Sequence, residues 1–171
     1  GNETKSSIYL TDKWNVNDVL TIKGGMRLTL NQLIGDYIAK KDRQEIMGEG
    51  GILGAHAPKT GINNSWWLKA LMASATYKVT DKFGVLGDFV YNEEGSHLNK
   101  YSTGSNPNIK KSKIPSASFG VFFNHDLFSV VSKATYINRD QYRTTVNFSN
   151  PKNPAQVERA TTSYDIQTIG W

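Results

Sequence analysis

Residues 75–95 read "ATYKVTDKFGVLGDFVYNEEG", two alternating runs on either side of a tight polar turn. In the second run, the apolar positions are Phe83, Val85, Phe89 and Tyr91, and the polar side chains Asp88 and Asn92 fall between them. A period of two is the period of an extended strand, whose successive side chains point to opposite faces. The stretch therefore predicts a β-hairpin with one apolar face and one polar face.

The same alternation recurs along the chain. In "LTIKGGMRLTL", residues 20–30, one face carries Leu20, Ile22, Met26, Leu28 and Leu30, and the other carries Thr21, Lys23, Gly25, Arg27 and Thr29. Similar runs cover residues 70–79, 116–124 and 128–137, a weaker run sets Tyr164 and Ile166 against Asp165 and Gln167, and a short, ambiguous run lies near residues 6–14. These patterns predict an all-β chain of about seven strands.

Short and long connections alternate between these strands. The short connections are residues 14–18, 80–82 and 124–126, which are rich in Asp and Asn, as hairpin turns are. The long polar connections are residues 31–65, 93–111 and 138–160, and the first could hold a short helix from Ile34 to Met47. This order predicts an antiparallel up-and-down meander, with its short turns at one end and its long loops at the other. No linker divides the chain, so residues 1–171 are expected to form a single unit.

Two kinds of structure explain strands with one apolar and one polar face. A soluble sheet buries the apolar face in a core, whereas a membrane barrel turns it toward lipid and lines a watery lumen with the polar face. Strands of about ten residues, aromatic side chains near strand ends and asymmetric connections favour the barrel. The charged side chains within the strands point the same way; they are Lys23, Arg27, Lys78, Asp88 and Lys133. A soluble sheet with one solvated face remains the alternative at this stage.

Composition excludes several classes of function. The chain has 171 residues, a net charge of +5 and no cysteine, which rules out disulfides, thiolate metal sites and a cysteine nucleophile. Its basic residues form only small clusters, so no nucleic-acid partner is predicted. The histidines His56, His97 and His125 are isolated, and no nucleophile motif occurs. Glu93 and Glu94 are interpreted as a solvated loop tip. No catalytic residue, metal site or cofactor is predicted, and nothing indicates an enzyme.

One hairpin carries a family resemblance. The segment "SIYLTDKWNVNDVLTIKGGMRLTLN", residues 7–31, resembles the strand–turn–strand unit in the barrels of TonB-dependent outer-membrane receptors, in a style similar to receptors of the Bacteroidetes. The matching residues are Tyr9, Asp12, Trp14, Leu20, Thr21, Gly25 and Arg27. The resemblance implies a bacterial outer-membrane protein that imports a nutrient, such as an iron chelate, a vitamin or a glycan, with energy coupled through TonB.

The resemblance also implies partners and a longer chain. Receptors of this family have a barrel of about 22 strands around a plug domain. We therefore expect residues 1–171 to be one segment of the barrel, without the plug, from a longer polypeptide. The implied partners are outer-membrane lipid, the plug, TonB and a small-molecule or glycan ligand. Two rival functions stay open: a small passive outer-membrane barrel, and a soluble β-domain that binds carbohydrate or protein through its long loops.

Six residues are candidates for ligand contact. Trp66, Trp67 and Tyr101 are placed at the outer mouth, where aromatic rings can stack on a ligand, and Lys23, Arg27 and Lys133 are placed in the lumen. Each group has a structural alternative. Tryptophans also form the interfacial belt of a membrane protein, and lysines and arginines also line a generally hydrated lumen.

Overall fold

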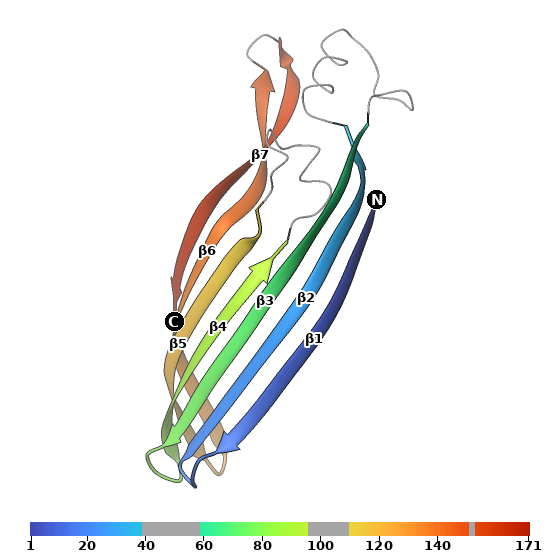
Figure 1. Ribbon diagram of the computed structural model, residues 1–171. Coiled ribbons are helices and arrows are strands. Elements are labelled where there is room, and N and C mark those ends of the chain that lie inside the picture. Colours follow the sequence, from blue (N-terminus) through green and yellow to red (C-terminus); the bar gives the residue numbers. More distant parts are fainter. Residues whose placement is uncertain (39–58, 96–109, 151–152) are drawn as a thin grey trace.

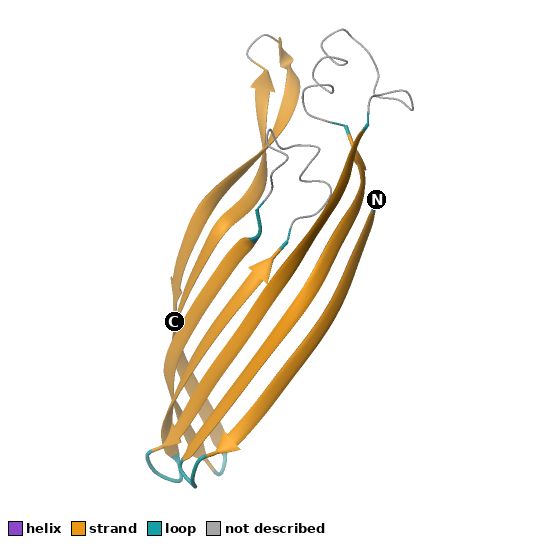
Figure 2. Ribbon diagram, viewed as in Figure 1, coloured by secondary structure: helices purple, strands orange, loops and turns teal. Residues whose placement is uncertain are grey.

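Seven antiparallel strands form one sheet in the order β1-β2-β3-β4-β5-β6-β7 (Figures 1 and 2). The computed structural model describes residues 1–38, 59–95, 110–150 and 153–171. The strands are β1 (Asn2–Asn15), β2 (Leu20–Tyr37), β3 (Thr60–Lys78), β4 (Phe83–Glu94), β5 (Ser112–His125), β6 (Phe128–Asn150) and β7 (Asn153–Gly170). Every strand pairs with its neighbour in sequence, so the predicted meander is confirmed. In the described part of the chain, no helical segment has the length and hydropathy needed to cross a membrane.

The short turns gather at the lower end of the sheet in Figure 1, as the alternating connections predict. Polar side chains close these turns locally. The Asn17 side-chain oxygen accepts hydrogen bonds from the backbone N–H groups of Val19 at 3.0 Å and Leu20 at 2.8 Å. The Thr80 hydroxyl accepts a hydrogen bond from the Phe83 N–H at 3.0 Å. Such side-chain caps are the physical reason that Asn and Thr mark these turns in the sequence.

Several predicted boundaries were wrong, because the strands extend beyond their alternating cores. The ambiguous first run is part of a strand of 14 residues. Ile34–Tyr37, the start of the expected helix, continues β2 and pairs with β3; residues 39–47 lie outside the described residues. The expected third long loop is instead mostly ladder, since β6 and β7 pair up to Asn150 and Asn153. The backbone N–H and C=O groups of these polar residues are hydrogen-bonded between β6 and β7. Because the residues lack apolar alternation, the sequence does not indicate a strand there.

The register assigns each side chain to a face. Arg27 lies opposite Tyr9 on one side and Ala70 on the other, and this parity puts Lys23, Asp88 and Lys133 on the same polar face. Buried side chains of the described residues gather mainly there: Thr29, Asn31, Leu33, Leu68 and Ser112. The polar face is therefore the inner side of the curled sheet seen in Figure 1.

No described residue covers the apolar face. Leu28, Phe89 and Val121 are 37%, 47% and 38% exposed. Aromatic side chains line both ends of this face: Trp14, Phe83, Phe123 and Phe128 near the short turns, and Trp67, Tyr91 and Tyr136 toward the other end. Among the described residues, the buried apolar side chains are Leu33 and Leu68, and both belong to the polar face. No dry core forms between the apolar side chains, as a soluble sheet would require.

The last strand departs from the expected facing. Arg139 pairs with Ile166, so Ile166 lies on the polar face although its run in the sequence suggests an apolar one. A bulge between Arg139 and Tyr142 contains Gln141 at a φ of 52°. An extra residue in one strand bends it and changes the pairing beyond it. This bulge changes the pairing of β6 beyond Arg139, whereas the face of Ile166 is set by the regular pairs from Thr135–Gly170 to Arg139–Ile166.

Phe122 on β5 lies over Gly84 on β4 where the two strands pair near the short turns. A Cβ at Gly84 would clash with the Phe122 ring and with the Tyr77 carbonyl oxygen. The missing side chain thus lets the aromatic ring cover the backbone, a contact that fixes register in curved sheets.

We predict that Gly84→Ala lowers the free energy of unfolding by about 1–3 kcal/mol, since the ring must move or the strands must part. Gly24→Ala is the matched control, because a Cβ there meets nothing within 4 Å. The measurement is equilibrium unfolding in urea of the chain folded into lipid vesicles. Equal stability of the two variants would contradict the packing described for Gly84.

Phe89 and Val90 provide a test of which face meets lipid, because they are neighbours on β4 with similar exposure, 47% and 39%, and opposite facing. Phe89→Lys should destabilise the folded chain in vesicles by about 2–4 kcal/mol, the cost of a lysine near the middle of a bilayer. Val90→Lys should cost far less, since its ammonium group enters the hydrated side. If the face of Phe89 met water instead of lipid, both variants would have similar small effects, and urea unfolding in vesicles distinguishes these outcomes.

Candidate polar-face site

A polar hollow of about 420 Å³ lies over the upper halves of β1 to β4 on the inner face of the sheet. Its walls mix both signs of charge with hydroxyl and amide groups; the lining residues are Glu3, Lys5, Ser7, Arg27, Thr29, Asn31, Leu68, Lys69, Ala70, Asn92, Glu93, Glu94 and Gly95. Most of these residues share a face because side chains of equal parity on paired strands point the same way, whereas Lys69 and Glu93 have the other parity and border the hollow at the β3–β4 seam.

Most polar groups in the hollow already have partners. The Ser7 and Thr29 hydroxyls lie 2.8 Å apart across the β1–β2 pair, and Lys5 forms an ion pair with Glu3 at 3.0 Å. Arg27 differs, because no described residue pairs with its guanidinium group. A guanidinium group offers five N–H donors in a planar fork that matches carboxylates and phosphates. Arg27 is therefore the group in the hollow best placed to accept an anionic ligand.

Asn31 is the most buried polar side chain described, at 1% exposed. Its side-chain oxygen has no hydrogen-bond partner among the described residues. Trp66 lies opposite Asn31 on β3, on the same face. Gly95 fits against both, since a Cβ at this position would approach Asn31 Nδ2 to 2.7 Å and the Trp66 ring to 3.5 Å. The tryptophan does not itself line the hollow but lies beside it, next to the lining residues Asn31 and Gly95.

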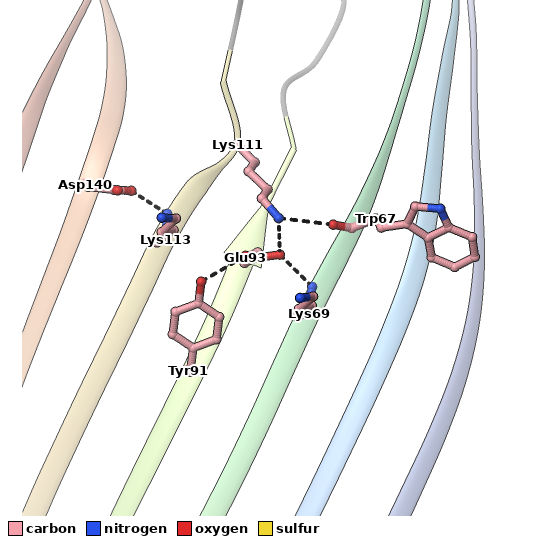
Figure 3. Close-up of polar contacts among 7 residues, drawn as sticks. All are labelled: Trp67, Lys69, Tyr91, Glu93, Lys111, Lys113 and Asp140. Atoms are coloured by element: carbon pink, nitrogen blue, oxygen red, sulfur yellow. Dashed lines mark hydrogen bonds and ion pairs between the residues drawn. The ribbon is translucent and has the colours of Figure 1, made fainter.

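Glu93 closes the seam where β4 separates from β3 (Figure 3). The β3–β4 ladder ends at the pair Ala70–Asn92, and the Glu93 carboxylate then accepts a hydrogen bond from the Lys69 backbone N–H at 2.9 Å. The same carboxylate accepts from the Tyr91 hydroxyl at 2.9 Å and pairs with the Lys111 ammonium at 2.8 Å. The side chain of Glu93 is 4% exposed, so the expected solvated loop tip was wrong.

Carboxylates replace a backbone acceptor at two further places, beyond the end of the β5–β6 ladder and at the bulge in β6. Asp140 on β6 accepts a hydrogen bond from the Lys113 backbone N–H on β5, and Asp165 on β7 accepts one from the Gln141 N–H on β6 at 3.0 Å. In each case a side chain supplies the acceptor that the neighbouring backbone no longer provides. Unpaired buried N–H groups are costly, so Asp140 lets β5 and β6 diverge, and Asp165 lets β6 bulge, without losing a hydrogen bond.

Ion pairs join β4 and β6 across the intervening strand β5. Lys133 pairs with Asp88, which also accepts a hydrogen bond from the Ser118 hydroxyl at 2.8 Å. Further toward the long loops, Arg139 pairs with Glu94. Both pairs are partly exposed to solvent, with 31% to 46% of the four side chains accessible. They support a hydrated inner surface, and each contributes little to stability on its own.

The structure brings only some of the predicted site residues together. Arg27 lines the hollow, and Trp66 lies at its edge. Lys23 is exposed on the same face nearer the short turns. Lys133 on β6 forms an ion pair with Asp88 on β4. Trp67 points to the opposite, apolar face and is 56% exposed, and Tyr101 lies outside the described residues.

Sequence reasoning missed the residues that build the hollow around Arg27. Asn31 and the acid Glu93 looked like the beginnings of loops, because the apolar alternation stops near them. One signal was available for Asn31: it lies four positions after Arg27, and an even spacing along one strand puts both side chains on the same face. No signal in the sequence places Lys111 beside Glu93, since that contact depends on how β4 and β5 leave the sheet.

The chemistry available here is binding. Within the described ranges, no group of three His, Asp or Glu side chains lies close enough to hold a metal ion. His125 sits in its turn and stacks on Phe128 at 5.2 Å, while His56 and His97 lie outside the described residues. Arg27, the buried amide and an aromatic edge can hold a polar or anionic molecule through hydrogen bonds and stacking.

Comparison with known proteins identifies the architecture. No family model and no curated protein sequence matches the chain. Among solved structures, the copper transporter OprC superposes with a TM-score of 0.73 at 13% identity, covering 98% of this chain and 26% of that one. The sheet therefore has the fold of one arc of that transporter's barrel.

A second receptor barrel gives the same result. A double mutant of the Serratia marcescens hemophore receptor HasR, solved with its hemophore HasA and heme, matches with a TM-score of 0.64 at 15% identity. The alignment covers 98% of this chain and 31% of HasR. The chain therefore spans between a quarter and a third of the length of these two receptors. At this level of identity the likeness establishes the fold alone, while the cargo is a separate question.

Glu93 and Glu94 form a matched pair for testing the seam. We predict that Glu93→Ala lowers the free energy of unfolding by about 1–3 kcal/mol, since it leaves the Lys69 N–H and the Tyr91 hydroxyl without their acceptor. Glu94→Ala should cost less than about 1 kcal/mol, because its ion pair with Arg139 is solvent-exposed. Urea unfolding in vesicles measures both, and equal costs would contradict the role assigned to Glu93.

Proposed function

We propose that this chain forms part of the barrel wall of a TonB-dependent receptor that imports a nutrient across the bacterial outer membrane. The observation that carries the proposal is the uncovered apolar face, bordered at both ends by aromatic side chains, opposite a face with charges and a polar hollow. From Phe83 to Tyr91 this face extends about 27 Å along the strand, or about 21 Å across a bilayer at a tilt of about 40°. Such a height is close to the apolar band of outer-membrane barrels, about 25 Å.

The edges of the sheet support membership of a larger barrel. Strands β1 and β7 each pair on one side only. Unpaired backbone groups are very unfavourable in hydrocarbon, so barrels close and leave no edge. We propose that further strands of a longer polypeptide pair with β1 and β7, that a plug domain fills the lumen, and that TonB supplies the energy. The Bacteroidetes-type assignment within this proposal rests on the first hairpin, with Tyr9, Asp12 and Trp14.

Arg27 and Trp66 form the ligand contact in this proposal, with Lys23 and Lys133 contributing positive charge elsewhere on the inner face. The cargo belongs to the iron chelates, vitamins or glycans, all of which combine polar groups with a surface that can stack on an indole ring. Copper and heme appear in the names of the two similar structures, and such different cargoes on one fold mean that the fold does not select among them. The receptor performs no reaction on its cargo.

The test is uptake by the full chain encoded by the gene, in cells with and without TonB, using labelled ferric chelates, cobalamin and oligosaccharides. We expect uptake of one of them to depend on TonB. Equal uptake without TonB would indicate a passive barrel, and a chain that stays monodisperse without detergent would indicate a soluble β-domain.

Variants on the polar face connect this function to the hollow. We predict that Arg27→Ala weakens binding of the imported ligand by about tenfold or more, the loss expected for a hydrogen bond to a charged group. Trp66→Ala should also weaken it, through lost stacking. Lys13→Ala serves as the control. Lys13 is on the polar face but lies opposite Lys23 in the β1–β2 register, near the short turns and away from the hollow. Unchanged affinity in the Arg27 variant would remove the hollow from the ligand path.

A further inference from the structure

A row of charged residues crosses the apolar face of the sheet, at the level where the apolar side chains of β4 end with Tyr91; on β2 and β3 the face continues beyond this row with Leu30 and Trp67. In the direction of the long loops, the next side chain on this face after Leu71 of β3 is Lys69, and the next after Tyr91 of β4 is Glu93. Glu93 lies opposite Lys113 on β5. Asp140 on β6 continues the row, because its carboxylate is bonded to the Lys113 backbone N–H. Lys69 shares its face with Leu28, its partner on β2, so this row belongs to the outer side of the sheet and not to the hollow alone.

The two signs of charge in this row are used differently. The carboxylates of Glu93 and Asp140 accept hydrogen bonds from backbone N–H groups and lie in the seams between strands. The ammonium groups of Lys69 and Lys113 form no ion pair with any described residue, and both residues are exposed. Lys111 adds a third ammonium group above Glu93, where it also donates to the Trp67 carbonyl oxygen at 3.4 Å (Figure 3).

Aromatic side chains frame these lysines. Tyr91 is the neighbour of Glu93 on this face, two residues nearer the short turns, and donates a hydrogen bond to it. Trp67 is the neighbour of Lys69 on this face, two residues nearer the long loops, and is 56% exposed. Tryptophan and tyrosine favour the level of lipid headgroups, where an apolar ring meets polar groups. Lysine stems can lie along apolar surface while their charges reach the headgroup layer. The row therefore sits where headgroup phosphates would be if the apolar face is in lipid.

We propose that Lys69, Lys111 and Lys113 bind the phosphate of an anionic lipid headgroup at the end of the apolar face nearer the long loops. This inference rests on the proposed function, because it requires the apolar face to contact lipid. The binding is electrostatic with hydrogen bonds from ammonium groups to phosphate oxygens. Glu93 positions Lys111 in the cluster and neutralises part of the charge, so that the site holds one headgroup without leaving three unpaired cations side by side.

The experiment is native mass spectrometry of the full chain in a nonionic detergent, titrated with phosphatidylglycerol or with phosphatidylcholine of the same acyl chains. The variant Lys69→Gln/Lys113→Gln removes the two unpaired ammonium groups. Lys13→Gln/Lys78→Gln removes the same charge from the polar face near the short turns. Circular dichroism in the same detergent checks that each variant remains folded.

We expect the wild type to retain phosphatidylglycerol in preference to phosphatidylcholine, and the Lys69/Lys113 variant to lose about tenfold or more of this preference. The Lys13/Lys78 variant should keep it. Equal retention of both lipids by the wild type, or an unchanged preference in the Lys69/Lys113 variant, overturns the site. Displacement of phosphatidylglycerol by inorganic phosphate at equal concentration would show a free-anion site and overturn the assignment to lipid.

The same measurements separate this inference from the proposed function. A wild-type chain that takes up neither detergent nor lipid contradicts the membrane location itself. A chain that binds detergent and both lipids equally keeps that location and loses only the headgroup site.

Discussion

The structure depends on an apolar sheet face that no other part of the described chain covers. A soluble sheet would pack this face against a second layer, but here Phe89 and Phe119 remain 47% and 63% exposed while the polar face carries the buried side chains. Hydrocarbon is the solvent in which such a surface is favourable. Hydrocarbon also requires that backbone N–H and C=O groups pair within the sheet, which the continuous ladder from β1 to β7 provides.

That requirement explains the acids at the ends of the ladders. Where β4 leaves β3, and β6 leaves β5, a carboxylate from Glu93 or Asp140 takes the place of the missing backbone acceptor. The strands can then diverge toward the long connections while their N–H groups stay satisfied. Glu93 also pairs with Lys111, whereas the ammonium groups of Lys69 and Lys113 form no ion pair with any described residue and stay available for other partners. Local structure and surface charge are thus linked at this level of the sheet.

The two faces consequently present different chemistry at similar heights. Toward the inside, Arg27, Asn31 and Trp66 border a polar hollow in which hydrogen bonding and stacking can hold a cargo. Toward the outside, Lys69, Lys113 and Trp67 mark the end of the apolar surface. Alternation along the strand produces this separation, since neighbouring residues such as Trp66 and Trp67 point in opposite directions. A single extended chain can in this way serve both a ligand and a lipid surface.

The sequence by itself determined the seven strands, their antiparallel order, the short turns and the facing of runs such as residues 20–30, because a period of two and turn-forming residues are local properties. Only the tertiary structure decided how far the strands extend, which face Ile166 occupies, where β6 bulges at Gln141, and the contact of Glu93 with Lys111 and the Lys69 backbone. These features depend on pairing between strands distant in sequence. For the candidate site, the alternation could place Lys23, Arg27 and Lys133 on the polar face. It could not show that Arg27 lines a hollow, or that Lys133 forms an ion pair with Asp88.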